Sequence, residues 1–218
     1  KVYGPDGCQI TSQAAKGISE KIGRLDLFRD VKRMEFEEAQ ERGMVSYIGE
    51  ETVTAYMEAV KAQSLLGEDT PACRDLPIVY SPLNGTGLEP VTRVLKEMGY
   101  ENVHLVKEQE QPDGTFPTCP YPNPEVPQAM ELGIALAENL GAEFMFATDP
   151  DCDRVGIAVK SAEGGYRRLS ANETGLLLFD YVCARRRAMG TMPKRPVMAK
   201  TIVTTSLAEP IAAHYGVE

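Results

Sequence analysis

Residues 142–159 read AEFMFATDPDCDRVGIAV and contain two apolar runs on either side of a short polar turn. The first run, residues 142–148, is dense in apolar side chains and too short for an ordinary helix, which indicates a buried strand. The second run, residues 155–159, has the same character. The stretch therefore predicts two buried strands joined by a tight turn that holds three aspartates.

Short apolar runs also alternate with helix-period segments on the N-terminal side of this stretch. Residues 76–80 (LPIVY) and 102–106 (NVHLV) predict two further strands. Between them, Val91 and Val94 have helical spacing, and a second apolar-periodic segment ends at Gly141, as a helix stop would. Strands that alternate with helices in this way are typical of an α/β domain with a largely parallel sheet.

The flanking segments predict additional helices and a boundary. Ser170 and Glu173 have the spacing of a capping box, which predicts the start of a new helix, and Gly164 with Gly165 predicts a boundary just before it. Helices are further expected at residues 12–25, 50–66 and 206–216, and short strands at residues 31–36 (VKRMEF), 44–48 (MVSYI) and 196–203 (PVMAKTIV).

Length and composition are those of a globular protein. The chain has 218 residues, of which 43% are hydrophobic and 25% charged, enough for one large or two small domains. No stretch approaches the roughly 18 consecutive apolar residues of a membrane span, and the first residues lack a signal-peptide pattern. We therefore expect a cytoplasmic protein with no membrane partner.

Charge and cysteine content exclude two further classes. The net charge of −9 repels a polyanion over most of the surface, so nucleic acid is not expected as a partner. The five cysteines are an odd number and show no C-x-x-C spacing, which indicates neither a disulfide framework nor a zinc site. A negatively charged substrate would need local compensation by a metal, by arginine or by a helix N-terminus.

The turn between the two strands carries the chemistry. Asp149, Asp151 and Asp153 occupy alternate positions, so their carboxylates can converge on one side of the turn. Hard oxygen ligands in this arrangement suit Mg²⁺ or another hard divalent cation, and without a cation they would repel one another. Arg154 follows directly and could hold a phosphate oxygen at an open coordination position of the ion.

The sequence of this turn has two other interpretations. An EF-hand loop needs Gly at its sixth position and Glu at its twelfth, where this chain has Arg154 and Lys160, so an EF-hand is excluded. The turn could also be a plain polar hairpin whose charges are only solvated. Three alternating acids followed by arginine between buried strands form a more specific combination than a generic run of charge.

A second motif, residues 84–87 (NGTG), follows a predicted strand and precedes a predicted helix. Backbone N–H groups at such a position could bind an anion. A dinucleotide fingerprint would need a third glycine where Pro90 stands, which weakens that interpretation. A purely structural tight turn and a ligand contact both remain open for this loop.

Several of these segments together resemble the α-D-phosphohexomutase superfamily, the phosphoglucomutase and phosphomannomutase enzymes. The metal loop of that family, D-P-D-A/G-D-R, is matched by residues 149–154, with Cys152 in the small-residue position. The family motif SPLHGTG is matched by residues 81–87, with Asn84 in place of histidine. Two more loops are similar, before the second helix of the central domain and at the opening of the third domain: residues 116–125 (FPTCPYPNPE) and 169–175 (LSANETG).

The resemblance implies a domain organisation. Residues 1–46 would be the end of a first α/β domain, residues 47–163 the whole of a second, and residues 164–218 the start of a third. For the second domain the resemblance implies a three-layer α/β/α unit with a mixed, mostly parallel sheet, flanked by partial neighbouring domains.

The resemblance also implies a function. In this family a phosphoserine passes its phosphoryl group to a hexose phosphate, and the resulting bisphosphate returns the other one, as in the conversion of glucose 1-phosphate to glucose 6-phosphate. Asp149, Asp151 and Asp153 would bind Mg²⁺ at the phosphoserine, and Arg154 would take part in catalysis. KVYGPDG looks like the continuation of the phosphoserine motif, which would make Lys1 the general acid/base. No serine of the chain lies in the family motif T-A-S-H-N-P, so the isolated chain is expected to be inactive.

A second hypothesis comes from another class of protein. The chain could be a non-catalytic nucleotide- or phosphosugar-binding α/β module that uses the loop at residues 84–87 and no metal. Stabilisation by Mg²⁺ or by NAD would distinguish the two hypotheses.

Overall fold

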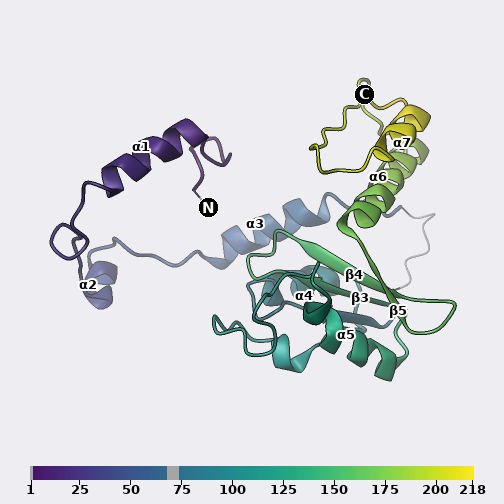
Figure 1. The fold of residues 1–218 in the computed structure, drawn as a ribbon, viewed down its shortest axis with the longest axis horizontal. Coiled ribbons are helices and arrows are strands. Elements are labelled where there is room, and N and C mark those ends of the chain that lie inside the picture. Colours follow the sequence, from purple (N-terminus) through teal and green to yellow (C-terminus); the bar gives the residue numbers. More distant parts are fainter. Residues whose placement is uncertain (1, 68–73) are drawn as a thin grey trace. The chain divides into compact units, whose positions relative to one another are not determined.

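The structure is a computed structural model that describes residues 2–67 and 74–218. The chain divides into two compact units, Lys1–Glu50 and Glu51–Glu218. Within the described ranges no helix has both the length and the apolar character needed to cross a membrane. The second unit holds the sheet and the aspartate turn (Figure 1).

An open mixed sheet lies in the second unit (Figure 1). Its strands are β1 (Ile78–Ser81), β2 (Val103–Leu105), β3 (Phe144–Thr148), β4 (Val155–Lys160) and β5 (Tyr166–Leu169). Their spatial order is β2-β1-β3-β4-β5. β1 pairs in parallel with β2 and β3, whereas β4 is antiparallel to both β3 and β5. The predicted α/β fold with a mixed sheet is confirmed, with its parallel pairings on one side of the sheet.

Helices lie on the connections between the parallel strands. α4 (Leu88–Glu97) leads from β1 to β2, and the 3-10 turn η1 (Lys107–Gln109) and α5 (Pro127–Leu140) lead from β2 to β3. Proline at the first position of α5 suits a helix start, and Gly141 closes the helix with φ 66°, which glycine adopts without steric cost. α3 (Glu50–Lys61) precedes β1. These helices lie within the segments that the sequence predicts.

The hydrophobic core forms between the middle of the sheet and α5. Val79, Met145 and Ala158 lie side by side on neighbouring strands and are fully buried, as is Met130 of α5. A Cβ atom on Gly133 would lie 2.1 Å from the Met145 methyl carbon, so this glycine lets α5 approach the sheet closely. The core is therefore anchored on β3, the strand that leads into the aspartate turn.

The sheet continues past the predicted boundary at Gly164 and Gly165. Both glycines have positive φ and form the turn of the hairpin between β4 and β5. The sequence does not predict β5, because Arg167 and Arg168 interrupt its apolar pattern. An edge strand with exposed arginines is a common way to keep a sheet edge from pairing with another chain.

The C-terminal segment contains α6 (Ala171–Ala188) and α7 (Ala208–Tyr215). The predicted capping box is present: the Ser170 hydroxyl accepts from the Glu173 N–H at 3.2 Å, and the Glu173 carboxylate accepts from the Ser170 N–H at 2.8 Å. The strand expected at residues 196–203 does not form. The Pro196 carbonyl accepts a hydrogen bond from the Glu218 N–H, and the Met198 N–H donates to the Glu218 carbonyl. No residue of this segment belongs to a β-strand.

Two helices lie within the described part of the first unit, α1 (Ser12–Ile22) and α2 (Phe36–Glu41). The prediction of strands at residues 31–36 and 44–48 is wrong. α2 begins at the last residue of the first range, and no residue of either range belongs to a β-strand. Within residues 2–50 the one β contact is an isolated bridge between Tyr3 and Gln9. A β-strand is stabilised by backbone hydrogen bonds to a neighbouring strand, so a strand-like sequence without such a neighbour does not form a strand.

Candidate metal centre

The aspartate turn lies between two hydrogen-bonded strands that hold both of its ends. Thr148 at the end of β3 and Val155 at the start of β4 are the last paired residues, so residues 149–154 form the loop of an antiparallel hairpin. β3 is buried between β1 and β4 in the sheet. The position of the first aspartate is therefore determined by the core of the domain.

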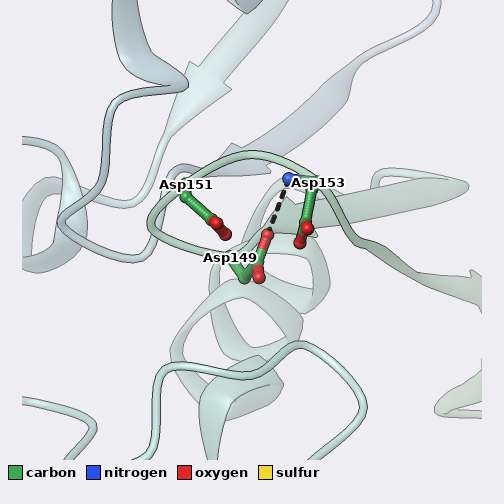
Figure 2. A group of neighbouring side chains, drawn as sticks. All are labelled: Asp149, Asp151 and Asp153. Atoms are coloured by element: carbon green, nitrogen blue, oxygen red, sulfur yellow. Dashed lines mark hydrogen bonds between the residues drawn. The ribbon is translucent and has the colours of Figure 1, made fainter. Parts of the chain in front are cut away.

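The three carboxylates converge. One oxygen atom from each of Asp149, Asp151 and Asp153 lies within 4.8 Å of the other two. Figure 2 shows the three side chains directed into the same space from around the loop. Asp149 is buried, whereas Asp151 and Asp153 are exposed. The alternate spacing in the sequence thus brings the three acids to one side of the turn.

Asp149 also fixes the shape of the loop. Its Oδ1 accepts hydrogen bonds from the backbone N–H groups of Asp153 and Arg154, both at 3.0 Å (Figure 2 draws the first). Its backbone carbonyl accepts from the Cys152 N–H at 2.9 Å. Cys152 adopts φ 59°, a left-handed conformation that is unfavourable for a residue with a Cβ. This strained residue lies between Asp151 and Asp153 in the loop.

The electrostatics of the cluster favour a bound cation. Burial raises the pKa of the Asp149 carboxyl above its usual range; the N–H of Arg154 opposes this shift, and the charges of Asp151 and Asp153 raise the pKa further. A divalent ion among the three oxygens would remove this repulsion and favour the ionised form. The donor set consists of hard oxygens only, which fits Mg²⁺ or a similar ion.

Arg154 is the nearest cation to this cluster among the ion pairs of the described residues. Its Nε lies 3.8 Å from Asp149 Oδ2 and 4.0 Å from Asp153 Oδ1, and its side chain is 53% exposed. Contacts of this length leave the guanidinium able to move toward an anion in solvent. Lys1, the other residue for which the resemblance implies a catalytic role, lies outside the described residues.

Three backbone N–H groups of the loop at residues 84–87 are already bonded within the protein. The N–H groups of Asn84, Gly85 and Thr86 donate to the backbone carbonyls of Gln109, Pro82 and Pro150, at 2.8, 2.9 and 2.9 Å. Hydrogen atoms already used in this way cannot bind a phosphate without breaking an internal bond. Of the two interpretations that the sequence leaves open for this loop, the geometry favours the structural one.

Several residues around the site escape prediction from the sequence. Gln109 is fully buried, and its Oε1 accepts from the Ser81 hydroxyl at 2.7 Å, which ties η1 to the end of β1. The hydroxyls of Tyr80 and Thr148 lie 2.9 Å apart, and Thr148 directly precedes Asp149. Both pairs join segments far apart in the chain. The sequence feature that could have indicated these contacts is the polar residue that ends each apolar strand, Ser81 in β1 and Thr148 in β3.

The cysteines of the described chain are all free: Cys8, Cys119, Cys152 and Cys183. Cys73 lies outside the described residues. Burial raises the pKa of the Cys119 and Cys183 thiols, which keeps them protonated and unreactive.

A known family model matches the second unit of the chain. Residues 54–164 match the family described as phosphoglucomutase/phosphomannomutase, alpha/beta/alpha domain II. The matched range contains β1 to β4, both helical connections and the aspartate turn, and it ends in the turn before β5.

Curated relatives align along nearly all of the chain. A phosphoglucomutase from Staphylococcus saprophyticus is 34% identical over 218 residues, which is 100% of this chain and 38% of that protein. A phosphomannomutase from Mycoplasmoides pirum is 29% identical over 99% of this chain, and a phosphoribomutase from Saccharomyces cerevisiae is 32% identical over 87%. The chain spans 38% of the length of the M. pirum relative and 32% of the yeast one.

A solved structure has the same fold. A phosphoglucomutase/phosphomannomutase family protein from Burkholderia thailandensis superposes with a TM-score of 0.56 at 23% identity, over 77% of this chain and 32% of that one.

Proposed function

The chain belongs to the phosphoglucomutase/phosphomannomutase family, and on that premise we propose that its second unit is the metal-binding domain of a sugar-phosphate mutase. The observation that carries this proposal is the convergence of three aspartate carboxylates at the end of a buried strand. The reaction we infer is intramolecular phosphoryl transfer on a hexose phosphate, of the glucose 1-phosphate to glucose 6-phosphate type.

Asp149, Asp151 and Asp153 would hold the cation, and Mg²⁺ fits their hard oxygen donors. When bound, the ion supplies positive charge at the transferring phosphoryl group, where the transition state spreads negative charge over the oxygens. Asp149 Oδ1 already accepts two backbone N–H groups, so Asp149 Oδ2 is the oxygen best suited to face the ion.

Arg154 completes the charge balance of the site. Three carboxylates and a divalent ion carry a formal charge of −1, and the adjacent guanidinium brings the local total to zero. Arginine remains protonated at any physiological pH and presents a planar set of donors to phosphate. We infer that Arg154 binds and orients a phosphate oxygen, and its loose contacts at 3.8 and 4.0 Å leave it free to turn toward one.

The remaining steps need groups beyond the described residues. The proposal includes a phosphoserine that donates to the sugar phosphate and a bisphosphate intermediate that returns the second phosphoryl group. It places Lys1 as general acid/base. The printed sequence contains no T-A-S-H-N-P motif, so we expect the isolated 218-residue chain to show no mutase activity. Turnover by this chain alone would contradict the proposal.

Cation binding by the 218-residue chain is the direct test. We expect Mg²⁺ to bind in calorimetry and Asp151→Asn to weaken binding by at least tenfold, since even changes next to metal ligands cost about 10–100-fold in affinity. Glu163→Gln is a matched control, because it removes one negative charge from the exposed turn at the other end of β4. Equal affinities for the wild type and Asp151→Asn would remove the metal assignment.

A thermal shift separates this function from the nucleotide-binding alternative. A ligand that binds only the folded state raises the melting temperature. We expect Mg²⁺ to raise it and NAD to leave it unchanged, because three N–H groups of the loop at residues 84–87 are already bonded within the protein. A shift with NAD and none with Mg²⁺ would reverse the assignment.

A further inference from the structure

Thr86 makes a pair of contacts that the proposed function does not use. Its backbone N–H donates to the carbonyl oxygen of Pro150 at 2.9 Å, and its side-chain hydroxyl donates to the same oxygen at 3.0 Å. Pro150 lies between the first two aspartates of the cluster. The partners are 64 positions apart in the sequence, so the contact joins two separate loops.

We propose that Thr86 is a positioning residue for the metal centre: by holding the Pro150 carbonyl from two donors, it sets where Asp151 presents its carboxylate. This inference rests on the proposed function, because it concerns the cation held by the three aspartates. It assigns to the loop at residues 84–87 the task of supporting the aspartate turn instead of binding a ligand.

The glycines on either side of Thr86 show how closely the two loops fit. A Cβ atom on Gly85 would lie 2.3 Å from the Cα and 2.7 Å from the carbonyl oxygen of Pro150. A Cβ atom on Gly87 would lie 2.4 Å from the Tyr80 hydroxyl and 2.7 Å from the Thr148 hydroxyl. The G-T-G pattern is therefore explained by close packing of Gly85 against Pro150 and of Gly87 against the Tyr80 and Thr148 hydroxyls, with the Thr86 hydroxyl between the two glycines.

The loop that carries Thr86 is itself held firmly. Asn84 is buried, and its side-chain amide donates to the backbone carbonyl of Gln111 at 2.9 Å. Its own backbone carbonyl accepts from the N–H of Asp113 at 3.1 Å. Leu83 and Asn84 both have positive φ, at 48° and 56°, a strained backbone that persists only where the surroundings enforce it. A support that is fixed in this way can hold the neighbouring turn in place.

Among the three aspartates, Asp151 is the one that shares a peptide group with the carbonyl held by Thr86. Asp149 and Asp153 are joined by the hydrogen bond from the Asp153 N–H to Asp149 Oδ1. The Pro150 carbonyl carbon is bonded to the backbone nitrogen of Asp151, so the peptide group that Thr86 holds leads directly into Asp151. Loss of the Thr86 hydroxyl should therefore weaken cation binding through Asp151.

The test uses Mn²⁺ as the probe, with free Mn²⁺ measured by electron paramagnetic resonance in titrations of the 218-residue chain. We expect Thr86→Val to raise the dissociation constant about tenfold, in the range found for residues that orient metal ligands. Thr86→Ser should bind as the wild type does, because it keeps the hydroxyl. Thr92→Val is the matched control, since the Thr92 hydroxyl bonds within its own helix, to the carbonyl of Leu88 at 2.6 Å.

A double-mutant comparison tests the route through Asp151. In the Asp151→Asn background, Thr86→Val should change the affinity by much less than tenfold, because the ligand that it positions has been altered. Equal effects in both backgrounds would overturn the assignment of the support to Asp151.

The outcomes separate this inference from the proposed function. If the wild type does not bind Mn²⁺, the proposed function fails and this inference fails with it. If the wild type binds and Thr86→Val binds equally well, or if Thr86→Ser is as weak as Thr86→Val, only the positioning role is overturned. Thr86 is exposed, so its variants should fold. Loss of the cooperative melt in both Thr86→Val and Thr86→Ala would mean that the contact stabilises the domain, and it would also overturn the positioning role.

Discussion

The two units of this chain contain similar sequence patterns but differ in what covers them. In the second unit the strands and α5 share a core in which Val79, Met130 and Met145 are fully buried. In the first unit none of the described residues, 2–50, is buried, and Phe28 is 96% exposed. A local pattern produces a helix in both units. Burial requires a second element that faces the first, and the described part of the first unit does not provide one.

The difference has consequences for function. The second unit places its aspartate turn at the end of β3, whose backbone is paired on both sides and whose Met145 side chain is buried. Such support can hold three like charges close together, because the repulsion acts against a core that resists deformation. Side chains of the first unit have no comparable support, and the described residues form no cluster of metal-ligating groups other than the aspartate triad.

Truncation of a core side chain should produce the largest difference in stability between the two units. We expect Met145→Ala to lower the free energy of unfolding by about 2–5 kcal/mol, because it leaves a cavity beneath α5. Ile22→Ala, in α1, should change it by less than about 0.5 kcal/mol, since Ile22 is 53% exposed. Urea denaturation of the 218-residue chain measures both. Similar losses for the two variants would show that α1 has a core that the structure does not indicate.

Replacement of glycine by alanine should decrease stability in the second unit and increase helix stability in the first. Gly85→Ala is expected to destabilise the second unit by about 1–3 kcal/mol, because its methyl group would overlap the backbone of Pro150. Gly17→Ala should favour helix in α1 by about 0.5–1 kcal/mol, since no atom lies within 4 Å of the added carbon and alanine is the better helix former.

Circular dichroism spectroscopy measures the effects of both glycine substitutions. The melting transition should move down for Gly85→Ala, and the helical signal at low temperature should rise for Gly17→Ala. Destabilisation by Gly17→Ala would contradict the open surroundings of α1, and a neutral Gly85→Ala would contradict the close approach of the two loops.

The sequence predicts the fold best where burial is strongest. The segments at residues 76–80, 142–148 and 155–159 are rich in apolar side chains, and each overlaps a strand of the sheet. β5 escapes prediction because arginines occupy its middle positions and its pairing with β4 depends on the turn at Gly164 and Gly165. Apolar content reports burial, so it identifies interior strands and misses a polar strand at the edge.

The candidate site is predictable where its residues are close in sequence and unpredictable where they are not. The convergence of Asp149 and its two alternate neighbours follows from their spacing in a tight turn. The bond from Thr86 to Pro150 and the burial of Gln109 depend on how distant loops meet in the folded chain. The sequence offers only the two glycines around Thr86 as a sign of close packing.

The smallest expected effect concerns ion pairs on the surface, and it again distinguishes the units. Glu97 of α4 contacts Arg93 of its own helix at 2.8 Å and Lys61 of α3 at 2.7 Å, so it joins two elements. Its hydrogen bonds with Arg93, and then those with Lys61, lower the pKa of Glu97 below its usual 4.5. In the first unit, Glu38 of α2 pairs with Arg42, the C-cap residue of the same helix.

A carboxyl with a lowered pKa in the folded state contributes stability above the pKa of the unfolded chain and loses it as the pH falls through the folded value. At neutral pH we therefore expect Glu97→Gln to lower the melting temperature by about 1–2 °C, with the difference from wild type shrinking below pH 4.5 and vanishing in stronger acid. Glu38→Gln should have a smaller effect, because its ion pair holds no second element. If the difference in melting temperature between the wild type and Glu97→Gln instead increased at acidic pH, the pH dependence would have the opposite sign. The ion pairs of Glu97 would then not be what stabilises the contact between α3 and α4.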